Sequence, residues 1–218
     1  MRHVVWDWNG TLFDDSELVV AALNHTLSGY DVEPLTPARY RELYTRPVHR
    51  FYERVLGRTV DDAEWDRLNH DFHVAYAEQL DVAQLADEAQ RALGLASIAA
   101  CTQSLLSMYP HEQLLPLVRE LELHHHFVRI DGLRGPAGGP KAPHLERHLL
   151  EMAAEVHVPM REVLVIGDAL DDAVAAEHVG ARCVLYEGGS HHRDELEAAG
   201  VPVATDLVAA LELGGVTG

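Results

Sequence analysis

The sequence predicts an α/β protein with a parallel sheet that carries helices on both faces, interrupted by an all-helical insert. Short segments rich in Val, Ile and Leu alternate with helical patterns through most of the chain, as in parallel sheets. Between residue 14 and about residue 80, by contrast, apolar residues recur only at helical spacing. We therefore expect a core of residues 1–13 and 87–218, with residues 14–86 as the insert.

The first expected strand, His3–Trp6, runs directly into polar residues. Apolar Val4, Val5 and Trp6 are followed by Asp7 and then by Asn9-Gly10-Thr11, which indicates a buried strand that ends in a sharp turn. A glycine at position 10 lets the backbone turn away beside the carboxylate of Asp7. Taken alone, an aspartate at a strand end is more often a turn or cap residue than a catalytic one.

Four helices are expected in the insert from capping residues and apolar stripes. The first opens near Asp14 and the third and fourth near Val48 and Asp61. Thr36-Pro37 marks the start of the second, because a capping hydroxyl precedes a proline at the first helical position. The aromatic residues of these helices are expected to form the small core of the insert.

After the insert, strands and helices alternate to the end of the chain. The expected strands are Ser97–Cys101, Phe127–Ile130, Val163–Ile166, Arg182–Tyr186 and a short last one near Val203. Thr102 and Asp168 then follow strands just as Asp7 does. Because ligands of such sheets gather at the carboxyl ends of the strands, these three residues are expected at one edge.

Composition and charge exclude several classes of partner. A formal net charge of −18 makes nucleic acid and anionic membrane surfaces unfavourable partners. No apolar run reaches transmembrane length, and the first residues read as a core strand rather than a signal peptide. Cys101 and Cys183 fall in apolar segments, which predicts buried thiols and a cytoplasmic location. The histidine tracts 124–126 and 191–192 lack the spacing of metal ligands.

Lys141 is the only lysine in the chain, beside sixteen arginines. It directly follows a Gly/Pro-rich loop over residues 135–140. Since the sequence uses arginine elsewhere, a lysine at this place indicates a site that needs a compact ammonium group rather than a planar guanidinium.

Asp7, Thr102, Lys141 and Asp168 with Asp172 stand in an order and in settings that resemble the four signature motifs of the haloacid dehalogenase-like hydrolase superfamily. The resemblance covers nearly the whole chain and is best to the branch similar to phosphoglycolate phosphatases. It implies a Rossmann-like core, a helical cap formed by the insert, and hydrolysis of a small phosphorylated metabolite.

Charge explains why such a site would need a metal ion. A carboxylate that attacks a phosphate dianion is repelled by it, and a hard divalent cation with oxygen ligands removes the repulsion. The resemblance implies Mg²⁺ held by Asp7, Asp168, Asp172 (favoured over Asp171) and the main-chain carbonyl of Asn9. It also implies an aspartyl-phosphate on Asp7, with Lys141 and Thr102 at the phosphoryl oxygens. Further candidates for binding substrate are Gln103, Gly10 and, from the insert, Arg46.

Asn9 departs from the family pattern, in which phosphatases carry a second aspartate as acid and base. An amide cannot exchange that proton, a loss that typically costs about 10²–10⁴ in rate. One hypothesis is a phosphatase whose leaving group needs little help, or whose proton comes from water, Asp14 or Asp15. Another is a phosphate-binding or regulatory protein with negligible turnover. Phosphonate cleavage is disfavoured because the insert has no lysine, and dehalogenation because it leaves Asp168 and Asp172 without a role.

Overall fold

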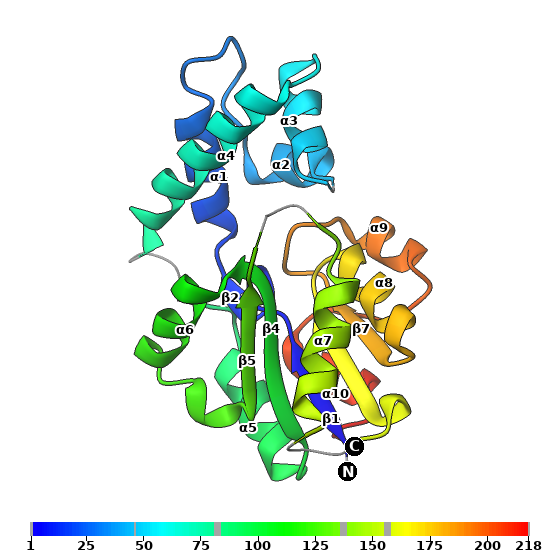
Figure 1. The fold of residues 1–218 in the computed structure, drawn as a ribbon. Helices are drawn as coiled ribbons and strands as arrows, with labels where there is room; N and C mark the ends of the chain where they lie inside the picture. Colours follow the sequence, from blue (N-terminus) through cyan, green and yellow to red (C-terminus); the bar gives the residue numbers. More distant parts are fainter. Residues whose placement is uncertain (1, 46, 81–83, 136–138, 155–157, 218) are drawn as a thin grey trace. The chain divides into compact units, whose positions relative to one another are not determined.

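The computed structural model describes the chain except for residues 1, 46, 81–83, 136–138, 155–157 and 218. It divides into two compact units (Figure 1). The larger unit comprises Met1–Phe13 and Leu85–Gly218, and the smaller one Asp14–Gln84.

The larger unit is built on a six-stranded sheet in the order β5-β4-β1-β6-β7-β8. Every pair of neighbouring strands is parallel. The strands are β1 (His3–Trp6), β4 (Thr102–Pro110), β5 (Arg129–Leu133), β6 (Val163–Gly167), β7 (Arg182–Tyr186) and β8 (Val203–Ala204). The predicted α/β fold with a parallel sheet is thereby confirmed. Because β1 lies between β4 and β6, its carboxyl end is at the point where the strand order reverses.

Helices cover both faces of this sheet. They are α5 (Ala89–Ile98), α6 (His111–Glu120), α7 (Ala142–Met152), α8 (Leu170–Val179), α9 (Arg193–Ala198) and α10 (Leu207–Leu213), with short 3₁₀ turns at His124–His126 and Met160–Glu162. Helix α7 packs against α8, and α5 packs against α10. Within the described part of the chain, no helix is both long and apolar enough to cross a membrane.

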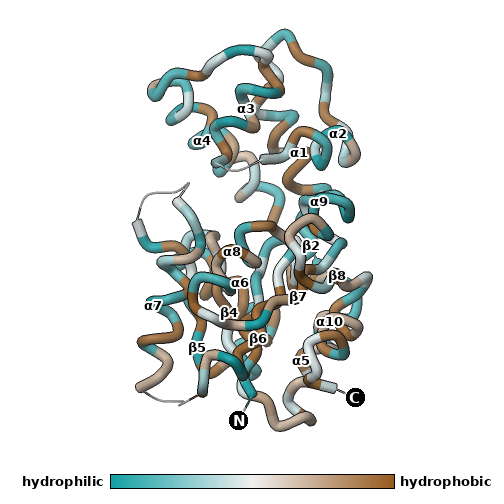
Figure 2. The backbone as a smooth tube through the Cα atoms, turned by 90° about the vertical axis from the view of Figure 1, so that its right-hand side faces the viewer, coloured by the Kyte–Doolittle hydropathy of each residue, from teal (hydrophilic) through white to brown (hydrophobic). Residues whose placement is uncertain are grey.

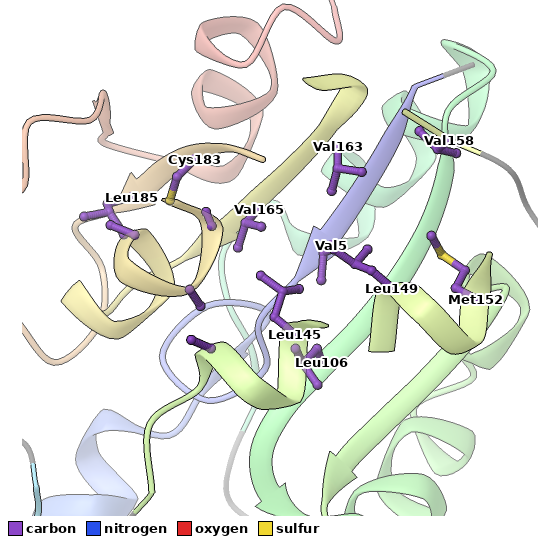
Figure 3. Close-up of a cluster of buried hydrophobic side chains, with 14 of the residues drawn as sticks. Val5, Leu106, Leu145, Leu149, Met152, Val158, Val163, Val165, Cys183 and Leu185 are labelled. Carbon is purple, nitrogen blue, oxygen red and sulfur yellow. The ribbon is translucent and has the colours of Figure 1, made fainter. Parts of the chain in front are cut away.

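The main hydrophobic core lies between the sheet and the pair α7 and α8. Leu145 and Leu149 of α7 face Val5 of β1 in this cluster (Figure 3). The four apolar residues that open β6 are completely buried, and the tube is brown along this central strand (Figure 2). As predicted, Cys101 and Cys183 are buried free thiols.

The smaller unit consists of helices α1 (Ser16–Thr26), α2 (Pro37–Leu43), α3 (His49–Leu56) and α4 (Asp62–Ala77). The Thr36 hydroxyl accepts a hydrogen bond from the Arg39 N–H, and the Asp61 carboxylate accepts one from the Glu64 N–H, so both predicted helix starts are capped. Phe51 is one of several aromatic residues in the core of this unit. A separate two-stranded sheet pairs β2 (Phe13–Asp14) with β3 (Gln84–Leu85).

The strand expected at Ser97–Cys101 is wrong. Ser97 and Ile98 end helix α5, Ala99 and Ala100 form a turn, and the strand begins only at Thr102. The polar residues that open β4 obscured it, because Thr, Gln and Ser in a row do not resemble a core strand. Their side chains are nevertheless satisfied inside the protein: Gln103, for example, accepts a hydrogen bond from the Trp6 indole N–H and donates to the Leu93 carbonyl.

On the other face of β4, a chain of hydrogen bonds crosses the core. His3 Nδ1 lies 2.8 Å from Thr102 Oγ1, and His3 Nε2 lies 2.8 Å from Ser104 Oγ. The Ser104 hydroxyl is also 2.8 Å from His148 Nε2 of α7. His3, Ser104 and His148 are at most 1% exposed, so the core buries two imidazole rings.

These buried rings make acid destabilisation a testable property. Burial, and secondarily His148, lowers the pKa of His3 from 6.5 to about 3. Below pH 6.5 the unfolded chain therefore binds a proton that the folded chain excludes, so stability falls as the pH drops toward 3. For His3 alone the slope is about 1.4 kcal/mol per pH unit. Urea unfolding of wild type and His3→Gln between pH 7 and pH 4 is expected to show a shallower slope in the variant. Equal slopes would contradict the buried neutral imidazole.

Candidate active site

The carboxyl ends of β1 and β6 place two aspartates side by side. Asp7 directly follows β1, and its N–H donates to the Ile166 carbonyl of β6 at 2.9 Å. Asp168 directly follows β6. Gly10 adopts a φ of +71°, and a Cβ there would lie 2.7 Å from Asp168 Oδ2, so only glycine fits this turn.

Asp172 joins these two aspartates from the first turn of α8. A Cβ on Gly167 would come within 2.2 Å of the Asp172 carboxylate, which explains why a glycine precedes Asp168 in this motif. One oxygen from each of Asp7, Asp168 and Asp172 lies within 4.8 Å of the others. Asp168 and Asp172 are 3% and 1% exposed, so this is a buried cluster of carboxylates.

Neighbouring groups hold two of these carboxylates in place. Asp168 Oδ2 accepts from the Ser190 N–H at 2.9 Å and from its hydroxyl at 2.8 Å, and Thr11 Oγ1 lies 3.4 Å from Asp168 Oδ1. Asp172 Oδ2 accepts from the Ala169 N–H at 3.1 Å. These bonds fix the carboxylate orientations before any ligand arrives. Ser190 and Ala169 were not singled out from the sequence, where a serine after two glycines reads as an ordinary loop residue.

Lys141, just before α7, places its ammonium group between two of the aspartates. Its Nζ lies 2.6 Å from Asp7 Oδ1 and 2.5 Å from Asp172 Oδ1, with the side chain 5% exposed. Burial alone would lower the pKa of Lys141, but Asp172 and Asp7 outweigh it and hold this pKa well above its usual range. The Lys141 N–H donates to the carboxylate of Asp171, which is not a member of the cluster of three aspartates.

The charge balance of the site fits a divalent cation. Burial above all, together with the charges of Asp172 and Asp168, raises the pKa of Asp7 to about 7, although Lys141 opposes them. Three carboxylates thus lie close to a single ammonium group, and an additional positive charge would favour the ionised form of Asp7. Carboxylate oxygens are hard ligands of the kind that Mg²⁺ prefers. The donor set therefore fits Mg²⁺ without any histidine or cysteine.

The structure corrects the predicted position of Thr102 and Gln103. Thr102 pairs with His3 at the amino end of β4, whereas Asp7 follows the carboxyl end of β1. Gln103 is buried and bonded to Trp6 and to α5. Both residues therefore lie at the wrong end of the strand to bind a ligand beside Asp7. The error arose because the predicted strand ended at Cys101, whereas β4 begins at Thr102.

Ser107 takes the position that was expected for Thr102. Its hydroxyl lies 3.4 Å from Asn9 Oδ1 and accepts from the Tyr109 N–H at 2.9 Å. A hydroxyl residue after the apolar pair Leu105-Leu106 is the sequence signal that could have identified it.

Of the other predicted residues, Arg46 lies outside the described residues. Asp15, one of two proposed proton donors, accepts from the Tyr76 hydroxyl at 2.7 Å within the smaller unit. Asp14, the other, accepts from the Ser16 hydroxyl.

Lys141 offers a direct test of why this site uses lysine. Replacing Lys141 by Arg keeps the charge but puts a planar fork into a buried space between two carboxylates. We expect the affinity for inorganic phosphate, measured by calorimetry with Mg²⁺ present, to fall at least about tenfold. The planar guanidinium cannot replace the small ammonium group, which contacts the aspartate and the ligand together. Near-normal affinity in a folded Lys141→Arg protein would show that charge alone suffices.

Comparisons with known proteins find hydrolases that are similar in sequence and in fold. A family model described as HAD-hydrolase-like matches residues 137–214. A phosphoglycolate phosphatase of Pseudomonas fluorescens is 24% identical over 88% of this chain and 71% of its own length. One from Mesorhizobium japonicum is 26% identical over 91% of this chain and 88% of its own.

Solved structures show the same fold. A hydrolase of the haloacid dehalogenase-like family from Streptococcus pneumoniae superposes with a TM-score of 0.81 at 17% identity, over 97% of each chain. A hydrolase from Pseudomonas syringae superposes with a TM-score of 0.76 at 23% identity over the full length of both chains.

Proposed function

We propose that this chain, a haloacid dehalogenase-like hydrolase similar to the phosphoglycolate phosphatases, is a Mg²⁺-dependent phosphatase that hydrolyses a small-molecule phosphate ester through an aspartyl-phosphate on Asp7. The observation that carries the proposal is the placement of Lys141 between Asp7 and Asp172, with Asp168 completing the carboxylate cluster. An ordinary buried ion pair needs one carboxylate, whereas phosphoryl transfer needs a nucleophile together with groups that neutralise phosphate.

The chemistry proceeds in two displacements at phosphorus. An oxygen of Asp7 attacks, the bond to the ester oxygen breaks, and the phosphoryl group becomes bound to Asp7. Water then attacks the same phosphorus atom and releases phosphate and the free carboxylate. Lys141 neutralises phosphoryl oxygens in both steps and keeps the free carboxylate of Asp7 ionised before the first. The Ser107 hydroxyl donates to another phosphoryl oxygen, in the role first assigned to Thr102.

Asp7, Asp168, Asp172 and the main-chain carbonyl of Asn9 would hold Mg²⁺. When bound, the ion reduces the repulsion between the attacking carboxylate and the phosphate. The side chain at position 9 is not needed for such a ligand, so an asparagine there is compatible with metal binding.

The side chain of Asn9 affects the rate of ester hydrolysis rather than metal binding. Its amide can donate and accept hydrogen bonds but cannot transfer a proton to the leaving oxygen. Esters with good leaving groups are therefore the favoured substrates. Independently of that argument, phosphoglycolate is the first metabolite to test, because the relatives are named phosphoglycolate phosphatases. The same residue supports the second candidate function, a phosphate-binding protein with negligible turnover.

Metal binding can be tested without any substrate. Calorimetric titration of the whole chain with Mg²⁺ is expected to show binding that Asp168→Ala abolishes or weakens at least about tenfold, since a ligand is lost. Asp171→Asn is the matched control, because it removes a neighbouring charge while its amide oxygen can still accept from the Lys141 N–H. Absence of Mg²⁺ binding, or equal binding by Asp168→Ala, would contradict the proposed metal site.

A further inference from the structure

We infer that His148 is a positioning residue for Lys141, because its hydrogen bonds to β4 and β5 fix helix α7 on the sheet and so place the ammonium group at Asp7. The inference rests on the role proposed for Lys141. It concerns a part of the core that the chemistry described so far does not use.

The contacts of His148 reach two strands at once. Its Nδ1 lies 2.7 Å from Asp131 Oδ2 of β5, and its Nε2 lies 2.8 Å from Ser104 Oγ of β4. Arg129 forms an ion pair with the same carboxylate of Asp131. The side chain of His148 is completely buried, so these bonds do not compete with water.

The hydrogen bonds of this network run in one direction, so that each group donates to the next. Burial alone would raise the pKa of Asp131, but hydrogen bonds from His148 and Arg129 hold it well below its usual range. Burial lowers the pKa of His148 although Asp131 opposes it, so the ring is neutral. An ionised Asp131 accepts from His148 Nδ1–H, and His148 Nε2 must then accept from the Ser104 hydroxyl. The Ser104 oxygen in turn accepts from His3 Nε2–H.

This chain connects the two elements that carry the reacting groups. His3 opens β1, and Asp7 directly follows the same strand. His148 lies on α7, seven residues after Lys141, which is two helical turns or about 10 Å along the axis. The hydrogen bonds from His3 through Ser104 to His148 therefore link the strand that presents Asp7 with the helix that follows Lys141.

Apolar packing alone would not set this position. Leu145, Leu149 and Met152 also bury their side chains on the inner face of α7. Dispersion contacts are not directional, so a helix held only by such side chains can shift slightly at small cost. A hydrogen bond weakens steeply with distance and angle. The two bonds of His148 thus define both the rotation of α7 and its position along the sheet.

Ser104, His148 and Asp131 have the connectivity of a catalytic triad, but their burial excludes that role. Ser104 is 0% exposed and His148 is 1% exposed. A substrate cannot reach the hydroxyl, and the oxygen of Ser104 is already bonded to both histidines. A buried polar network that takes no part in the reaction costs desolvation free energy. In exchange it specifies a single arrangement of the helices and strands that it joins.

The single lysine of the chain provides the test. Full-length protein made with ¹³C,¹⁵N-lysine gives one set of lysine signals, all from Lys141, and they can be observed without substrate. In His148→Leu we expect this signal to shift or split, with kcat/KM reduced about 10–100-fold by misplacement of the ammonium group. Leu149→Ala is the matched control, since it removes a buried side chain from the same helix but no hydrogen bond. It is expected to lower stability and leave the lysine signal unchanged.

Ser104→Ala breaks the same chain with a smaller change in volume, and it decides the matter if His148→Leu does not fold. Wild-type lysine signals in a folded His148→Leu or Ser104→Ala protein would overturn the inference. So would an equal disturbance in Leu149→Ala, which would reduce His148 to general packing. Because the signal is read in the free protein, a chain that hydrolyses no ester but shows the lysine shift would contradict the phosphatase function alone.

Discussion

Asn9→Asp is expected to raise the hydrolysis of an alkyl phosphate by an amount approaching 10²–10⁴, the usual contribution of general acid–base catalysis. The side chain of Asn9 lies beside Ser107 at the carboxyl end of β1, and aspartate nearly matches asparagine in size. The new carboxylic acid could protonate the departing alkoxide and later accept a proton from water. An aryl phosphate, whose leaving group departs without protonation, should gain much less.

The ratio of the two effects identifies the cause. Asn9→Ala is the control, because it removes the amide without supplying a proton carrier and should accelerate neither ester. If Asn9→Asp leaves both esters at background, proton transfer was not what limited turnover, and the phosphate-binding function becomes the better account. Equal gains for both esters would point to a change in binding instead.

Asp7→Asn is expected to reduce phosphate release by about 10⁴–10⁶, as the loss of a nucleophile does in other covalent catalysts. The amide has nearly the same shape, but it is a poor nucleophile and no longer carries the charge that Lys141 neutralises. Steady-state release of phosphate from an aryl phosphate measures the effect over the widest range, because that ester needs the least help in leaving.

The same substitution one residue outside the cluster separates chemistry from electrostatics. Asp171→Asn removes a charge near Lys141, yet it keeps an oxygen that can accept from the Lys141 N–H. It should therefore reduce the rate by less than about tenfold, as expected for a nearby charge that is not part of the reaction. Similar losses in Asp7→Asn and Asp171→Asn would contradict a nucleophile at position 7.

The sheet and the carboxylate cluster were largely readable because chemistry-bearing residues directly follow strongly apolar segments. Asp7 and Asp168 each end such a segment, and parallel topology brings these ends together. The choice between Asp171 and Asp172 needed the structure, because it depends on which face of the first turn of α8 looks toward Gly167. The sequence alone does not determine this rotation of α8 about its axis.

Polar residues inside the core caused the main error. Thr102, Gln103 and Ser104 begin a buried strand, but their partners lie far away in sequence, in β1, α5 and α7. Local propensity therefore favoured a turn where long-range hydrogen bonds stabilise a strand. His148 was missed for the same reason, because the role of a histidine on the apolar face of a helix becomes visible only when its partners Ser104 and Asp131 are located.

The most direct test of the phosphatase function is phosphate release from a panel of small phosphate esters, including phosphoglycolate and an aryl phosphate. Wild type and Asp7→Asn are assayed side by side, each with Mg²⁺ and with the ion removed by chelation. We predict that wild type hydrolyses at least one ester, that chelation stops the reaction, and that Asp7→Asn does not support it. Release by wild type that equals release by Asp7→Asn for every ester would contradict the proposal.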